Sequence, residues 1–105
     1  MKKNTEYQIF IGCEDFHVQD EIVSEDELRE MAAQFFIRNE IAFSMFSVKG
    51  GYLRGDGRFI SENSLCINII ESDDLDIIKL AKSLSMFMNQ ERALVVKDVI
   101  NTEFC

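Results

Sequence analysis

The residue types best suited to chemistry are a cysteine and a histidine in the spacing Cys13-x-x-x-His17. An imidazole can take the proton of a neighbouring thiol and so make it a nucleophile, and the same two side chains can bind a metal ion. A metal site would also need Cys66 or an acid, yet His17 is the only histidine and there is no Cys-x-x-Cys pair. The spacing therefore predicts no metal and no cofactor, and a small enzyme that uses Cys13 and His17 stays open as an alternative.

Glu62 is the second candidate for chemistry because it is an acid within the largely apolar stretch 59–70. A buried carboxylate without a partner has a raised pKa, as general acids and bases often do. Glu62 could instead pair with Arg54 or Arg58 or line a pocket. An enzyme that depends on Glu62 is a second form of the same alternative.

Glycines between Gly50 and Gly57 resemble a phosphate-binding loop only in composition. Phosphate loops lead from a strand into a helix N-terminus, whereas this segment leads into a second strand-like run. Asp56-Gly57 between two β-favouring runs is typical of a hairpin turn, and Gly50-Gly51 is typical of a bulge. We expect a hairpin here.

Composition limits the classes of function. The 105 residues carry a net charge of -8 and contain no run of 18 apolar residues and no apolar leader. We therefore expect one domain over residues 1–105, located in the cytoplasm, with no membrane contact. Direct binding to nucleic acid is disfavoured because phosphates would be repelled, while a basic protein partner is favoured.

Hydrophobic periodicity predicts four strands and two helices. Ser24 and Glu27 form a capping box before a helix that extends to about Asn39. Ser72-Asp73-Asp74 is expected to begin the second helix, which ends at 89–91. The strands are expected at 6–13, 43–53, 59–70 and 93–96, and the Ile-rich stretch 64–70 is expected in the sheet interior.

The order β-α-β-β-α-β predicts an α+β, ferredoxin-like sandwich with a four-stranded antiparallel sheet in the order 4-1-3-2 and two helices on one face. In that topology the end of the first strand, the hairpin and the junction before the last strand meet at one end of the sheet. We expect a ligand site there, formed by Glu14, Asp15, His17, Tyr52, Arg54, Arg58, Glu62, Gln90 and Glu91.

A series of short motifs is spaced along most of the chain: Tyr7-x-Ile9-Phe10-Ile11-Gly12, then Gly50-Gly51 and Gly57, then Glu62-x-x-Leu65, then Asn89-Gln90-Glu91 before a Val-rich strand. This series resembles small bacterial and phage families of unknown function. The resemblance implies a ferredoxin-like fold. It carries over no catalytic residue.

The helix-free face of such a sheet would expose Phe10, Cys66 and Ile70, and sheets often hide apolar faces of this kind by self-association. Our leading hypothesis is a non-enzymatic binding module for a small ligand or protein, which forms a homodimer or higher homo-oligomer through this face. The alternative is an acidic inhibitor or decoy from a phage or mobile element that blocks a nucleic-acid-binding protein. The small enzyme described above ranks third.

Overall fold

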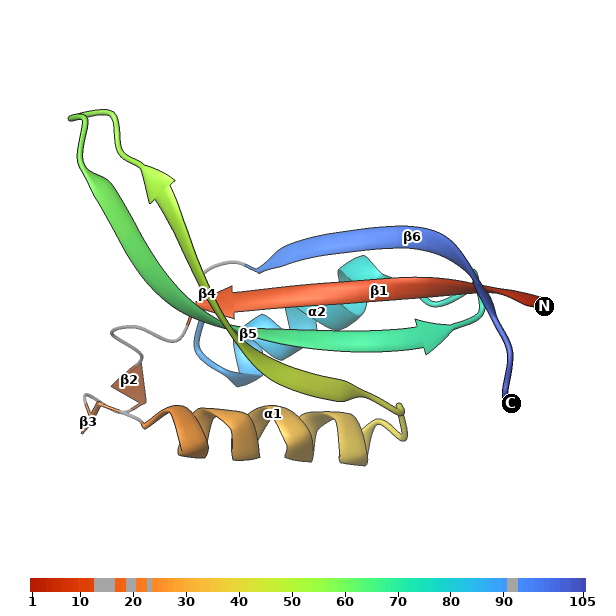
Figure 1. The fold of residues 1–105 in the computed structure, drawn as a ribbon. Coiled ribbons are helices and arrows are strands. Elements are labelled where there is room, and N and C mark those ends of the chain that lie inside the picture. Colours follow the sequence, from red (N-terminus) through yellow and green to blue (C-terminus); the bar gives the residue numbers. More distant parts are fainter. Residues whose placement is uncertain (13–16, 19–20, 23, 91–92) are drawn as a thin grey trace.

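The computed structural model describes residues 1–12, 17–18, 21–22, 24–90 and 93–105. Its elements, shown in Figure 1, are β1 (Lys2–Gly12), β2 (His17–Val18), β3 (Glu21–Ile22), α1 (Glu25–Arg38), β4 (Ser44–Leu53), β5 (Phe59–Glu71), α2 (Ile77–Phe87) and β6 (Leu94–Thr102). Among the described residues, no helix is both long and apolar enough to cross a membrane.

The main sheet contains four antiparallel strands in the order β4-β5-β1-β6. Each of the two inner strands is paired on both sides: Ile67 of β5 lies opposite both Ile9 of β1 and Met45 of β4. The predicted interior position of the Ile-rich stretch is therefore confirmed. The first and last strands were predicted too short, because β1 already begins at Lys2 and β6 continues to Thr102.

The predicted ferredoxin-like sandwich is wrong, because the sheet curls into a half-barrel over its two helices. Two short strands, β2 and β3, also form a separate sheet that was not expected. The pairing lengths explain the curl. β5 is bonded to β1 only from Ser64 onward, so its first part pairs with β4 alone, and two-stranded ribbons twist more than wide sheets.

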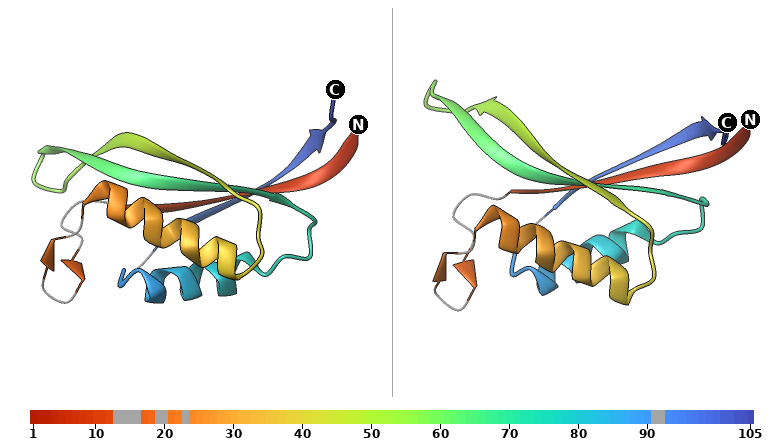
Figure 2. Two further views of the ribbon diagram at one scale, coloured as in Figure 1. Left: turned by 90° about the horizontal axis from the view of Figure 1, so that it is seen from below. Right: turned by 60° about the horizontal axis from the view of Figure 1, so that its bottom comes forward.

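Residues 49–63, which we call the hairpin arm, extend beyond the end of β1. Their register runs from Lys49 opposite Asn63 to Leu53 opposite Phe59. Figures 1 and 2 show this part of β4 and β5 rising away from both helices. Since β1 does not extend this far, the described side chains of the hairpin arm are exposed, except that of Ile60, which is half-buried.

The core lies between the sheet and the two helices, which cover the same side of the sheet (Figure 2). Every second residue of β1 from Thr5 to Ile11 is buried, as alternation in a half-covered strand requires. The helices contribute the facing layer, formed by Leu28, Ala32, Phe35, Phe36, Ile77, Ala81, Leu84 and Met88. Burying each large apolar side chain contributes about 1.5–3 kcal/mol.

The first helix begins as the capping box predicts. The Ser24 hydroxyl accepts a hydrogen bond from the Glu27 amide at 3.2 Å and donates one to the Glu27 carboxylate at 3.1 Å. The start of the second helix was predicted too early: α2 begins at Ile77, where Asp76 accepts from the Lys79 amide at 3.1 Å. Residues 72–76 form a loop instead.

The central position of β5 leads to a stability prediction. Ile67→Ala should lower the free energy of unfolding by about 2–5 kcal/mol, because Ile67 is fully buried and its loss leaves a cavity. Ile78→Ala is the matched control, since Ile78 is 53% exposed, and it should change stability by only about 0.5 kcal/mol. Urea denaturation measures both. Equal effects would contradict the interior position of β5.

Candidate functional site

The turn of the hairpin arm brings two of the predicted site residues together. The Arg54 amide donates to the Arg58 carbonyl at 2.8 Å, and the Gly57 amide donates to the Arg54 carbonyl at 3.0 Å. Asp56 accepts from the Arg58 amide at 3.1 Å, and its carboxylate lies 3.9 Å from the Arg54 guanidinium. Gly57 has a φ of 84°, which favours glycine. The predicted Asp-Gly hairpin is confirmed, and it presents two arginines at its tip.

Tyr52 and Glu62 occupy neighbouring register positions on the hairpin arm, where Tyr52 pairs with Ile60 and Gly50 pairs with Glu62. Strand alternation places positions 50, 52, 60 and 62 on the same face. Among the described side chains, none comes within 4 Å of a Cβ placed at Gly50, the register partner of Glu62. Gly51 belongs to the opposite face, where an added Cβ would clash with the Phe59 ring.

The other predicted site residues do not join this group in the described part of the chain. His17 lies in β2 opposite Ile22, and Gln90 lines a cavity of about 420 Å³ between α2 and β6. Pairing of β5 with β1 begins at Ser64. Arg58 lies six positions earlier in the chain, which corresponds to about 20 Å of extended strand. The tip is therefore remote from Gln90. Cys13, Glu14, Asp15 and Glu91 lie outside the described residues.

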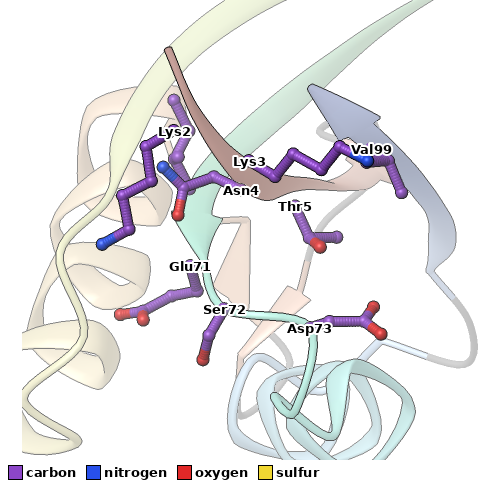
Figure 3. Close-up of a pocket in the computed structure, with 9 residues that line it drawn as sticks. Lys2, Lys3, Asn4, Thr5, Glu71, Ser72, Asp73 and Val99 are labelled. Atoms are coloured by element: carbon purple, nitrogen blue, oxygen red, sulfur yellow. The ribbon is translucent and has the colours of Figure 1, made fainter. Parts of the chain in front are cut away.

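A cavity at the opposite end of the sheet was missed by sequence reasoning. It has a volume of about 580 Å³ and is shown in Figure 3, and it is lined by Lys2, Lys3, Asn4, Thr5, Ile70, Glu71, Ser72, Asp73 and Val99. The signal in the sequence that could have indicated it is the pair Lys2-Lys3. Thr5 of β1 lies opposite Glu71 of β5, so the two strands that line the cavity are adjacent there.

Loop 72–76, which forms one wall of this cavity, is held to the sheet by several polar contacts. The Tyr7 hydroxyl donates to the Ser72 carbonyl at 2.9 Å, and the Lys97 ammonium lies 2.8 Å from the Asp73 carboxylate. The hydrogen bond and charge of Lys97 lower the pKa of Asp73, with a smaller contribution from Thr5. The hydrogen bond that Lys97 donates to Asp73 in turn raises the pKa of Lys97.

Cys66 is ill suited to act as a nucleophile. It is fully buried in β5, and burial, assisted by the charge of Glu6, raises the pKa of its thiol. The expectation that the helix-free face would expose Cys66 is therefore wrong, although Ile70 on that face is 49% exposed. Within the described part of the chain, no three or more His, Cys, Asp and Glu side chains gather as metal ligands would.

Comparison with known proteins identifies two phage proteins of similar structure. One is a phage SAM lyase solved in complex with S-methyl-5'-thioadenosine, which is 25% identical, with 90% of this chain and 80% of that chain covered and a TM-score of 0.55. The other is a phage SAM lyase in its apo state, which is 20% identical, with 98% and 93% covered and a TM-score of 0.57. No protein-family model and no curated protein matches the sequence.

These similarities correct two of our hypotheses about function. The non-enzymatic binding module is overturned, and so is the expectation that the chain is more likely not an enzyme, because two structures similar to it are those of a phage SAM lyase. The acidic inhibitor loses its support for the same reason. The expected resemblance to small phage proteins holds at that coarse level.

The ion pair of Asp73 and Lys97 predicts a pH dependence. The lowered pKa of Asp73 means that the pair stabilises the fold above the pKa of an unfolded aspartate, roughly 3.9, and that this contribution is lost as pH falls through the folded-state value. The raised pKa of Lys97 means that the contribution of the pair is lost again as the pH rises above that of an unfolded lysine, roughly 10.4. Asp73→Asn should therefore lower the free energy of unfolding at neutral pH and flatten its decrease in acid, as denaturation at several pH values would measure. Both side chains are largely exposed, so the change should be small. Identical pH profiles for the variant and the native chain would contradict the pair.

Proposed function

We propose that this chain is a lyase that cleaves S-adenosylmethionine and releases S-methyl-5'-thioadenosine. The observation that supports this most directly is the structural similarity to the phage SAM lyase bound to S-methyl-5'-thioadenosine, which extends over 90% of the chain at 25% identity. The net charge of -8 is compatible with a cationic substrate, because a sulfonium is attracted by a negative field.

The proposed reaction breaks the bond between the sulfonium sulfur and the γ-carbon of the methionine part. The bonding electron pair stays on sulfur, which becomes a neutral thioether in S-methyl-5'-thioadenosine. The four-carbon fragment is completed without water, either when its own carboxylate closes onto the γ-carbon or when it loses a β-proton. In the first route the protein mainly folds the substrate and excludes water, since opposite charges combine more readily in an environment of low polarity.

The hairpin arm is the surface that we propose for this reaction. It carries Glu62 opposite the open backbone of Gly50, with position 52 on the same face. A carboxylate at Glu62 has a role in either route, because it can hold the substrate's α-ammonium during closure or accept the β-proton during elimination. Arg54 and Arg58 at the tip add two cationic groups that suit the substrate's carboxylate.

Glu62→Gln tests this assignment. The variant keeps the size of the side chain and removes its charge, so release of S-methyl-5'-thioadenosine should fall by roughly 100-fold or more, as loss of a general base does. Chromatography of the products measures the rate. Glu103→Gln is the matched control because Glu103 is exposed beyond the end of β6.

The outcomes separate the reaction from its site. A native chain that releases no S-methyl-5'-thioadenosine overturns the proposed function. A native chain that turns over while Glu62→Gln is equally fast overturns only the role of Glu62. A substrate deuterated at the β-carbon distinguishes the two routes, because only proton loss would slow its turnover.

We also propose that the helix-free face of the main sheet pairs with a second copy of the chain. Phe46, Cys66, Phe10 and Leu94 are consecutive register partners and form one apolar row across all four strands. Phe46 is 45% and Leu94 64% exposed, while the helices cover the other face. Four strands of about nine residues present roughly 600 Å² of sheet, which is close to one side of a small specific interface.

A basic protein partner stays a prediction from the net charge alone.

Phe46→Asp and Leu94→Asp should each convert the native homo-oligomer into monomers, because a carboxylate would be buried without a partner in the paired faces. Met86→Asp is the control, since Met86 is 82% exposed on α2, away from the apolar row. Light scattering at micromolar concentration measures the mass of each protein. A native chain that is already monomeric there would contradict the pairing.

A further inference from the structure

We propose that the cavity between the start of β1 and the end of β5 binds a zwitterionic α-amino acid with an aliphatic side chain. This proposal does not depend on the lyase function. Glu71 ends β5, whereas Glu62 lies nine positions earlier, or about 30 Å along the strand, so one small substrate cannot occupy both places. The cavity is therefore a second site.

The charges around the cavity favour a ligand that carries both signs. Lys2 and Lys3 are consecutive residues of β1, and Figure 3 shows their side chains extending in opposite directions, that of Lys3 toward Val99. Thr5 pairs with both Glu71 and Val99, so strand alternation places Lys3 on the same face of the sheet as Glu71 and Val99. Neither Lys3 nor Glu71 forms an ion pair with a described residue. A simple anion would be repelled by Glu71, and a simple cation would be repelled by Lys3. A zwitterion can place its carboxylate at Lys3 and its ammonium at Glu71.

The remaining acid of the cavity is already neutralised. Asp73 is paired with Lys97 at 2.8 Å, and this contact lowers the pKa of Asp73. Glu71 is therefore the carboxylate of the cavity that is available for an ammonium group. One carboxylate and one lysine on the same face complement a single α-amino acid, and a dianion or a diamine would not be matched.

Apolar side chains give the cavity its second property. Val99 is 64% exposed, contributes to the lining and pairs with Thr5, so it shares a face with Glu71. Ile70 pairs with Glu6 and therefore faces the other side of the sheet. An aliphatic side chain that covers Val99 would remove apolar surface from water, which contributes about 25 cal/mol per Å². The volume of about 580 Å³ accommodates such a ligand and is far larger than a single ion requires.

The walls are joined to each other before any ligand binds. Tyr7 holds Ser72, Asp73 holds Lys97, and the Asn4 amide donates to the Thr102 hydroxyl, so the loop, β1 and β6 are linked. A preformed cavity loses less conformational entropy when it binds a ligand. The lysine side chains are exposed and are the parts that a ligand would order.

Titration of the full chain with L-norleucine, followed by amide NMR, tests the proposal. We expect saturable shifts confined to residues 2–5, 70–73 and 99. Hexanoate lacks only the ammonium and pentylamine lacks only the carboxylate, so each should bind at least about tenfold more weakly, as expected when one charged hydrogen bond is lost. Lys3→Gln and Glu71→Gln should weaken L-norleucine by a similar factor. Lys49→Gln, an exposed lysine of the hairpin arm, is the matched control.

Three results would overturn the proposal: no saturable shift with L-norleucine, binding of hexanoate or pentylamine as tight as that of L-norleucine, or unchanged affinity in both Lys3→Gln and Glu71→Gln. The amide spectrum of each variant shows whether it is folded. The comparison of the three ligands on the native chain keeps the proposal testable even if a variant unfolds. Because the readout is binding, failure of the lyase assay would leave this result unaffected.

Discussion

The structure depends on β5, which pairs with two neighbours that each cover only part of its length. Only residues 64–68 have a partner on each side, and Leu65, Cys66 and Ile67 there are fully buried. Its first part pairs with β4 alone. A strand that is fixed in the core at one end and free at the other must carry any excess twist into the free end, which explains why the sheet curls instead of forming a sandwich.

The same constraint separates the two candidate sites. The hairpin arm exists because β1 ends at Gly12 while β5 has already run from Phe59 to Ser64. The cavity exists because β1 and β5 continue together past α2, whose first residue is Ile77, so loop 72–76 must return along the edge of the sheet. The hairpin arm and the cavity therefore lie at opposite ends of the main sheet. At each end, polar residues extend from the strands beyond the part that the helices cover, where a ligand can approach them.

The sequence was informative wherever one local interaction decides the structure. The Ser24 cap, the Asp56-Gly57 turn and the buried Ile-rich stretch were predictable because each depends on residues that are close in the chain. The curl and the cavity depend on how far one strand overlaps another, and periodicity does not encode that length. The start of α2 was misjudged for a related reason: Asp73 suits a helix N-terminus, but its pairing with Lys97 of β6 holds it in the loop.

Function was the least predictable level, because no short motif accompanies the proposed chemistry. Internal closure of a sulfonium substrate needs no metal, no activated nucleophile and no phosphate loop, so the patterns that identify most enzymes have no reason to be present. What such a reaction requires is a surface that folds the substrate and removes water from opposite charges. A twisted strand pair with one open glycine and one acid can supply that surface once a second layer covers it, which links the lyase proposal to the exposed apolar row on the same sheet. If the apolar row is covered by a second copy, the hairpin arm of one chain would be enclosed by the sheet of another, and catalysis and self-association would be two consequences of the same uncovered face.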